Sequence, residues 1–328
     1  MDYFNAMNYI EEKNKLGTVP GLDNVKELLT RLGNPQNKCR CLHIAGTNGK
    51  GSIFAFVQEA LIDAGYKVGR YISPTIFEYR ERFQINKNYI SEESFAALLT
   101  RVSVHVDEMI AEGMASPTAF EIETAIAFLY FYEEQVDFAL IECGMGGLLD
   151  GTNVIDKPFL TVMASISMDH MQFLGSTLRD IATNKAGIIK SFGKCISYPQ
   201  CEEVSDVLYN KCKVENAILT FADPKQLEIL SMDVSGTTFI YKGERYKISL
   251  LGEHQVYNAI TALEVLEDIA KDESFALVNT HIKNGLKKTD WQGRMTKIND
   301  EPLMFVDGAH NEAAWIFLRN TVNKYFTN

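Results

Sequence analysis

Hydrophobic residues along this chain fall into two patterns, short continuous runs and longer segments in which they recur every three or four positions. The short runs end at glycine, serine or an acid, which is typical of buried strands; they cover residues 42–45, 66–72, 137–142 and 158–166. The periodic segments are typical of helices and cover residues 2–15, 24–32, 53–61, 91–112 and 118–134. Because strands and helices alternate, the pattern predicts βαβ units.

This alternation places the chain in the α/β class, with a mostly parallel sheet flanked by helices. Helix 118–134 is apolar around much of its circumference, so we expect it to be buried against the sheet. Residues 191–222 predict a further strand, helix and strand. Residues 237–250 predict a β-hairpin with a three-residue loop, and a helix begins in residues 252–262.

A glycine-rich turn lies between the first predicted strand and its helix, and it reads Gly46, Thr47, Asn48, Gly49, Lys50, Gly51 and Ser52. Glycines let several backbone N–H groups point at one anion, and the N-terminus of the following helix adds a partial positive charge. Lys50 is placed to neutralise outer phosphates, and the Ser52 hydroxyl to reach a Mg²⁺ ion. The usual phosphate loop has four residues between its first glycine and Gly-Lys, whereas Gly46 and Gly49 enclose two. A plain connecting turn is therefore the alternative.

Polar residues follow the other predicted strands, and in parallel sheets ligands gather at the carboxyl ends of strands. Glu142 ends its strand downstream of the glycine-rich turn, where a carboxylate is expected to hold or orient Mg²⁺. Ser73 and His170 also stand at strand ends, and Asp169 beside His170 favours a metal ligand there. Taken alone, Ser73 is typical of a strand terminus and His170 of a surface histidine.

Two charged residues inside predicted helices have ordinary explanations as well. Glu121 stands three residues after Thr118, which predicts a capping box at the start of helix 118–134. Lys185, considered by itself, is typical of a solvated helix lysine.

Composition narrows the class of protein. The 328 residues are 46% hydrophobic with a net charge of −11, and no basic run is present, so a nucleic-acid surface is excluded. Because the net charge is negative, binding of an anionic nucleotide requires a local cluster of positive side chains. The candidates for this cluster are Lys50, Arg80, Arg82 and Lys185. The sequence has neither a signal-peptide pattern nor a membrane-length apolar run, and its six cysteines lack paired zinc spacing. We expect a cytoplasmic monomer that binds no membrane.

Several motifs in one order resemble the Mur ligase superfamily, and within it the folate branch of folylpolyglutamate and dihydrofolate synthases. They lie at residues 46–52, 73–86, 118–121, 142–153, 169–190, 254–259, 291–294 and 307–311. The resemblance implies an ATP-binding domain over residues 1–297, followed at 298–328 by a linker and the start of a C-terminal glutamate ligase domain. Members of the family continue well past this point, so we expect a chain truncated in its second domain.

The resemblance also implies roles for individual residues. Lys50, Lys185 and His170 would be catalytic. Nucleotide contacts would come from Gly46, Thr47, Asn48, Gly49, Lys50, Gly51, Ser52, Asn258, Arg294, Asp307 and His310. Two Mg²⁺ ions would be held by Ser52, Ser73, Glu142, His170 and Lys185, the lysine as a carbamate formed with CO₂. Arg82, Phe120 and Glu121 would bind the pterin substrate.

Three positions depart from the family pattern. Thr75 stands where many members have histidine, Asn184 where the residue before the lysine is usually glutamate, and Gln292 where a proline is usual. The change at Asn184 removes a negative charge beside the predicted carbamate.

The function implied is ATP-dependent amide synthesis that joins L-glutamate to a folate γ-carboxylate, or to dihydropteroate, through an acyl phosphate. Three alternatives remain: a Mur ligase of peptidoglycan synthesis, which the loop at 73–86 disfavours; a small-molecule kinase, which would not need the motif at 307–311; and a catalytically impaired nucleotide-binding fragment. The expected partners are ATP, L-glutamate and folate or dihydropteroate.

Overall fold

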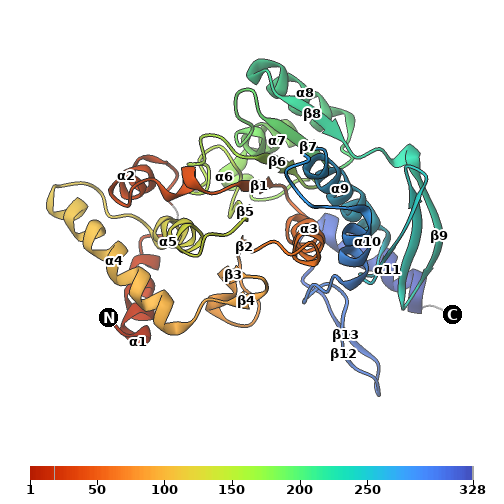
Figure 1. Cartoon of the computed structure of the whole chain (residues 1–328), viewed down its shortest axis with the longest axis horizontal. Helices are drawn as coiled ribbons and strands as arrows, with labels where there is room; N and C mark the ends of the chain where they lie inside the picture. Colours follow the sequence, from red (N-terminus) through yellow and green to blue (C-terminus); the bar gives the residue numbers. More distant parts are fainter. Residues whose placement is uncertain (18, 327–328) are drawn as a thin grey trace.

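The computed structural model, which describes residues 1–17 and 19–326, is built on an eight-stranded sheet with the order β4-β3-β2-β5-β1-β6-β7-β8 (Figure 1). The parallel strands are β1 (Cys41–Ala45), β2 (Val68–Tyr71), β5 (Phe138–Glu142), β6 (Leu160–Met163), β7 (Lys194–Ser197) and β8 (Ile218–Phe221). Two short strands, β3 (Phe83–Ile85) and β4 (Asn88–Tyr89), extend one edge in antiparallel pairing. The predicted α/β class and mostly parallel sheet are confirmed.

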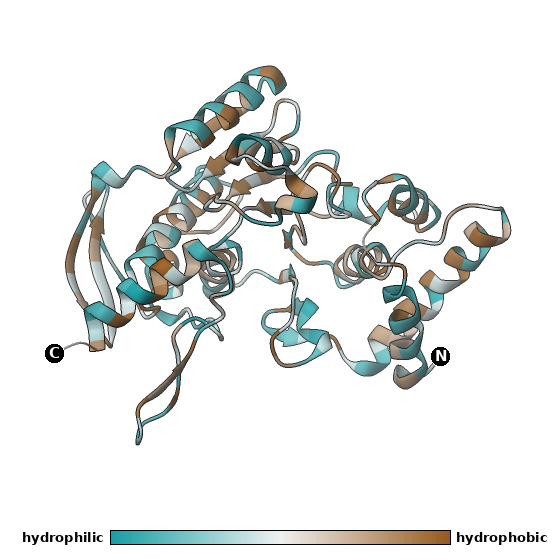
Figure 2. Cartoon of the chain, turned by 180° about the vertical axis from the view of Figure 1, so that it is seen from behind, coloured by the Kyte–Doolittle hydropathy of each residue, from teal (hydrophilic) through white to brown (hydrophobic). Residues whose placement is uncertain are grey.

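Helices cover both faces of this sheet, because side chains of a strand point alternately to opposite sides. Leu42 and Ile44 of β1 pack with α3 (Lys50–Asp63), α9 (Glu253–Ala270) and α10 (Asn279–Lys288). Cys41 packs on the other side with α1 (Tyr3–Asn14), α2 (Asp23–Arg31), α4 (Glu92–Ala111) and α5 (Ala119–Glu133). Figure 1 shows these two groups of helices on either side of the central strands, and Figure 2 shows hydrophobic colouring along those strands.

Smaller elements complete the chain. A third cluster joins Ala45 to α7 (Leu178–Ala186) and α8 (Glu202–Glu215), and the short α6 (Met171–Leu174) precedes them. An antiparallel sheet contains β9 (Leu227–Asp233), β10 (Gly236–Tyr241) and β11 (Glu244–Ile248). The final segment forms β12 (Thr296–Asn299), β13 (Met304–Val306) and α11 (Glu312–Phe326). Turns of 3₁₀ helix lie at Pro35–Lys38, Tyr79–Arg82 and Pro224–Gln226.

The hairpin predicted over 237–250 forms, but its loop has two residues rather than three. Lys242 and Gly243 both have positive φ, 51° and 80°, which is the backbone of the two-residue turn that matches the twist of paired strands. The sequence reading also missed β9, whose residues are mostly exposed and therefore lack a hydrophobic run.

Helix α5 is the buried helix that the sequence predicts. Its N-terminus carries the expected capping box: the backbone N–H of Thr118 donates to Glu121 Oε2 at 2.7 Å, and the Glu121 N–H donates to Thr118 Oγ1 at 3.3 Å. The helix lies directly on β2, where a Cβ on Gly69 would be 2.6 Å from Cδ1 of Phe131. Gly69 therefore permits the close approach of α5 to the sheet.

The substitution Gly69→Ala tests this close packing. We expect it to lower the free energy of unfolding by about 1–3 kcal/mol, because the added methyl overpacks a site with no free volume. In the double variant Gly69→Ala/Phe131→Leu the smaller side chain should remove most of that penalty, which denaturant unfolding of both single variants and the double variant measures. Additive effects of the two substitutions would show that the contact does not limit the packing.

Candidate active site

The glycine-rich turn forms a tight loop at the carboxyl end of β1, and α3 begins at Lys50. Two of its glycines are required by their surroundings. Gly49 has φ +92°, and a Cβ there would lie 2.5 Å from Oδ1 of Asn258; a Cβ on Gly46 would lie 2.6 Å from the Cβ of Ala164. The loop is thus pressed between the segment after β6 and the start of α9.

Thr47 fastens this loop to the residues after β6. Its N–H donates to the carbonyl of Ser165 at 2.7 Å, its hydroxyl donates to the carbonyl of Ser167 at 3.0 Å, and the Ser167 N–H donates back to that hydroxyl at 3.1 Å. The side chain of Thr47 is therefore engaged in holding the loop.

Lys50 and Lys185 meet at one backbone oxygen. The ammonium groups of both donate to the carbonyl of Gly46, at 3.2 Å from Lys50 and 3.0 Å from Lys185. Lys185 is 2% exposed, and burial together with the nearby charge of Lys50 lowers the pKa of its ammonium to about 8. The predicted solvated alternative for Lys185 is wrong, because α7 turns this residue into the interior.

Glu142 lies beside Lys50, and Ser52 follows Lys50 in the first turn of α3. Oε1 of Glu142 lies 3.7 Å from the ammonium of Lys50, and burial raises the pKa of this carboxyl while Lys50 opposes the rise. The Ser52 hydroxyl is buried and finds no hydrogen-bond partner among the described residues. Glu142 and Ser52 are thus two candidate hard oxygen ligands near Lys50, of the kind that Mg²⁺ prefers.

The loop after Glu142 is held by Asp150. Its carboxylate accepts from the N–H of Met145 at 2.7 Å, from the N–H of Thr152 at 3.0 Å and from the Thr152 hydroxyl at 2.5 Å. That hydroxyl lies 2.8 Å from Nε2 of His43, whose pKa burial lowers to about 3, so the imidazole is neutral. This buried network supports the loop after Glu142. That loop packs against the backbone of Lys185, and Gly147 is the residue that makes the close contact.

His170 lies at the edge of this group. It precedes α6 with a left-handed backbone, its side chain is half exposed, and its Nε2 is 3.7 Å from Asp169. Asp169 in turn acts electrostatically on Lys185, so the segment of His170 lies in the neighbourhood of Lys185.

A cavity of about 360 Å³ opens next to these groups, a size typical of small-molecule sites. The predicted pterin-binding residues Arg82, Phe120 and Glu121 all line it, together with Ser73. Further lining residues that the sequence reading did not single out include Val19, Pro20, Leu149, Phe173 and Leu174. The carboxylate of Glu121 caps α5 as the capping box predicts, and Glu121 also lines the cavity; its substrate role stays a prediction.

Arg82 is oriented by Glu123, a residue absent from the sequence predictions. Glu123 lies 3.2 Å from Nη1 of Arg82 and accepts a hydrogen bond from the Tyr79 hydroxyl at 2.8 Å. Arg80 pairs instead with Glu78 at 3.2 Å, outside this cavity. Arg80 is therefore not part of the positive cluster.

A second cleft joins the glycine-rich loop to the end of the described chain. Asn48, Gly49 and Ser52 line it together with the predicted nucleotide-binding residues Asn258, Arg294, Asp307 and His310. Gly51 instead faces the ring of Trp291, to which a Cβ would lie 2.6 Å away. The structure therefore brings the distant motifs to one place.

Asn311 closes this cleft and is a residue that the sequence reading quoted without a role. Its side-chain amide exchanges two hydrogen bonds of 3.1 Å with that of Asn48, and it accepts the N–H of Ala314 at the start of α11. His254 stacks on Phe317 of α11 at 5.0 Å, and burial lowers its pKa to about 4. Both contacts join α11 and the residue before it to this cleft.

Two further findings concern membrane-spanning helices and clusters of metal-binding side chains. Within residues 1–17 and 19–326, no helix is long and apolar enough to cross a membrane. The same residues contain no group of three histidine, cysteine, aspartate or glutamate side chains that could hold a metal ion. A metal here would depend on hydroxyl and ligand oxygens as well as Glu142.

Comparison with known proteins gives one family. The Mur ligase middle domain matches residues 44–266. The chain is 37% identical to the dihydrofolate synthase/folylpolyglutamate synthase of Bacillus subtilis, covering 99% of this chain and 77% of that protein. It is 32% identical to the folylpolyglutamate synthase of Lacticaseibacillus casei, covering 95% and 74%.

Solved structures agree with these sequence matches. An FPGS–AMPPCP–folate complex superimposes with a TM-score of 0.93 at 30% identity, covering 100% of this chain and 82% of that one. The folylpolyglutamate synthase of Thermotoga maritima superimposes with a TM-score of 0.87 at 31% identity, covering 99% and 75%.

The lowered pKa of Lys185 predicts a pH-dependent stability. Between about pH 8 and 10.5 the unfolded chain holds a proton on this lysine that the folded chain has released, so stability rises with pH across that window. Relative to Lys185→Met, we expect the wild type to gain about 2–3 kcal/mol between pH 7.5 and 10 in CO₂-free buffer. Denaturant unfolding at both pH values measures it.

The matched control is Lys213→Met, which removes an exposed lysine of α8. It should follow the wild-type pH profile. A wild-type minus Lys185→Met difference that does not change with pH would contradict the buried, neutralised lysine.

Proposed function

The chain belongs to the Mur ligase family, among the folylpolyglutamate and dihydrofolate synthases, and from that premise we propose that it uses ATP to join L-glutamate to the carboxylate of a folate or of dihydropteroate. The observation that carries this proposal is the meeting of Lys50, Lys185 and Glu142 at the glycine-rich loop. Residues of that loop line the second cleft, and Asn184, the neighbour of Lys185 in sequence, lines the substrate-sized cavity. A ligase of this kind must bring two anions, ATP and a carboxylate, into one site.

The reaction needs an activated carboxylate, because a free carboxylate has no adequate leaving group. The carboxylate oxygen attacks the γ-phosphorus of ATP, ADP leaves, and an acyl phosphate forms. The glutamate amine then attacks the acyl carbon, phosphate leaves and the amine loses a proton, which yields the amide. Lys50, fixed by its bond to the Gly46 carbonyl, places positive charge where the transferred phosphoryl group carries its negative charge.

Mg²⁺ fits the oxygen ligands of this site. Glu142 would supply a carboxylate and the orphaned hydroxyl of Ser52 a neutral oxygen, and Ser73, on the wall of the larger cavity, would supply another. When bound, Mg²⁺ would neutralise charge on the phosphate oxygens.

We propose further that Lys185 forms a carbamate. The neutral amine attacks the carbon of CO₂ and releases one proton, which converts an ammonium into an anionic oxygen ligand. Its pKa of about 8 gives Lys185 more of the neutral amine near pH 7 than an ordinary lysine has. The carbamate would face the segment of His170, which the family resemblance assigns to a second Mg²⁺.

We also propose that the chain has two domains, with the second beginning after residue 297. The boundary proposed after residue 297 falls inside β12, and the nucleotide cleft takes residues from both sides of it. The hydrogen bonds between Asn48 and Asn311 and the stacking of His254 on Phe317 are among the contacts that link the two parts.

The function is tested by incubating the protein with ATP, Mg²⁺ and L-glutamate, and with either tetrahydrofolate or dihydropteroate. We expect phosphate release and a pterin product heavier by one glutamate residue, and the substrate that is extended identifies the acceptor. Lys50→Met should reduce the rate at least a hundredfold, because removal of one charged group at the transferring phosphoryl group costs about 3 kcal/mol or more.

Lys26→Met, which removes a lysine on α2, serves as the control and should keep the wild-type rate. Phosphate release without any glutamate-extended product, with both pterin substrates, would refute the proposed ligation. An unchanged rate in Lys50→Met would refute the role of the glycine-rich loop.

The cavity is tested separately with Phe120→Ala. The Phe120 ring borders the cavity and packs against Gly144, where a Cβ would lie 2.7 Å from it. We expect the KM for the pterin substrate to rise about tenfold or more, since a buried aromatic contact is lost, while the KM for ATP stays within twofold. Equal changes in both KM values would contradict a pterin site here.

A further inference from the structure

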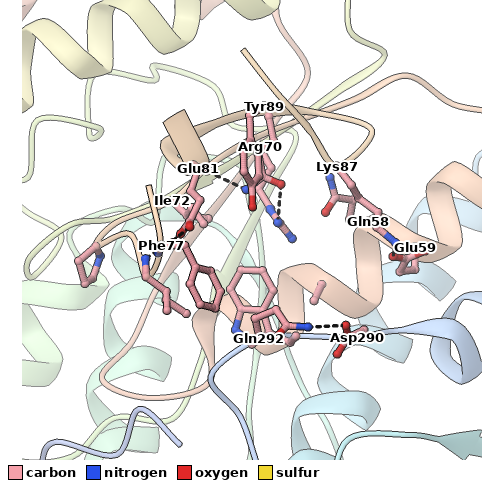
Figure 3. Close-up of a pocket in the computed structure, with 15 residues that line it drawn as sticks. Gln58, Glu59, Arg70, Ile72, Phe77, Glu81, Lys87, Tyr89, Asp290 and Gln292 are labelled. Atoms are coloured by element: carbon pink, nitrogen blue, oxygen red, sulfur yellow. Dashed lines mark hydrogen bonds and ion pairs between the residues drawn. The ribbon is translucent and has the colours of Figure 1, made fainter. Parts of the chain in front are cut away.

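A second, smaller cavity lies on the α3 side of the sheet, apart from the predicted pterin site. Its volume is about 200 Å³, and we call it the Arg70 pocket; its lining includes Gln58, Arg70, Phe77, Lys87 and Trp291. Pro74 borders both this pocket and the larger cavity, so the two lie on opposite sides of the segment that begins at Ser73. Figure 3 shows Arg70 reaching toward the middle of the lining residues.

Arg70 is a buried cation without a carboxylate partner in the described chain. It is 6% exposed, its Nη2 donates to Gln84 Oε1 at 2.7 Å, and its guanidinium lies 4.5 Å over the ring of Trp291. Its Nε has no hydrogen-bond partner among residues 1–17 and 19–326. A buried charge that lacks a counter-ion is costly, and a bound anion would offset that cost.

Neighbouring acids are engaged elsewhere. The carboxylate of Glu81 accepts the backbone N–H groups of Ile76, Phe77 and Glu78 at 2.7–2.9 Å, and Glu59 pairs with Lys87. Glu142, which also acts electrostatically on Arg70, pairs with Lys50. No ion pair of Arg70 forms within the described residues, so its charge is available to a ligand.

Gln58 adds a second donor. It comes from α3, is 1% exposed, and its Nε2 has no hydrogen-bond partner in the described part of the chain. Gln84 cannot satisfy it, since its own amide is committed to Arg70 and to the carbonyl of Glu81. The lining thus offers a planar guanidinium and an amide N–H, both suited to carboxylate oxygens.

The rest of the lining favours a small amphipathic anion. Phe77 is 72% exposed and provides an apolar wall, which the aliphatic part of a carboxylic acid would contact and an inorganic phosphate would not. We propose that the Arg70 pocket binds the carboxylate of a glutamate unit, either free L-glutamate or a glutamyl group joined to the pterin substrate. The inference rests on the proposed function, because that reaction supplies both forms of glutamate.

Trp291 makes the pocket observable. The chain has two tryptophans, and the other, Trp315, is 59% exposed on α11, so Trp315→Phe leaves Trp291 as the single reporter of this pocket. We would titrate this variant, without ATP or pterin, with L-glutamate, with N-acetyl-L-glutamate as the amide-linked form, and with inorganic phosphate, and follow tryptophan fluorescence.

We expect a saturable change with at least one of the two glutamate probes, and the probe that binds more tightly identifies the source. In Arg70→Met the same probe should bind at least tenfold more weakly, with Arg70→Lys between the two and Gln58→Met also weakened. Arg101→Met, which removes a surface arginine paired with Glu133, should bind as the parent does. Thermal unfolding of each variant reports whether it folds. If Arg70→Met does not fold, the Gln58→Met variant provides the test of the pocket instead.

The proposal is overturned if neither glutamate probe changes the fluorescence, if only phosphate does, or if the folded Arg70 and Gln58 variants bind like the parent. A failure of the pocket proposal can be distinguished from a failure of the proposed function. A wild type that forms the glutamyl product without a fluorescence response refutes only the pocket. A response without product in any assay refutes the ligase reaction and leaves the pocket.

Discussion

The carbonyl oxygen of Gly46 is the contact on which the arrangement of the site depends. It accepts hydrogen bonds from both Lys50 and Lys185, residues that lie on different helices and more than a hundred positions apart in sequence. Two ammonium groups held this close in a buried place repel one another, and the lowered pKa of Lys185 is one result of that repulsion and of burial. Such a site is electrostatically prepared for anions, which is what a phosphate-transferring ligase requires.

The sheet makes this meeting possible. Because β1, β5 and β6 are parallel neighbours, their carboxyl ends lie side by side, and the loops after them deliver Lys50, Glu142 and the Ser165 segment to one edge. Positions without a Cβ allow the close approach of these loops, as at Gly46 and Gly49. The resulting site is narrow, buried and rich in fixed donors and acceptors.

Two cavities flank the segment that starts at Ser73, and their chemistry differs. The larger one has the aromatic ring of Phe120 and the cation of Arg82 on its wall. The smaller one combines the buried charge of Arg70 with the face of Trp291, which itself packs on Gly51 of the glycine-rich loop. A ligand in the smaller cavity would therefore affect the start of α3, because Trp291 lines that cavity and also contacts Gly51.

The sequence by itself determined the elements and the local motifs. Hydrophobic periodicity identified the parallel strands and the buried helix α5, and the spacing from Thr118 to Glu121 identified its cap, because these signals depend on residues only a few positions apart. The glycine-rich loop and the acid at the end of β5 could be predicted for the same reason. What only the tertiary structure decided are the pairings between distant segments: Asn48 with Asn311, Lys185 with Gly46, and the burial of Arg70 against Trp291. No local pattern encodes these, since each follows from how the packed layers of the fold place residues far apart in the chain, and burial then sets their charge and reactivity.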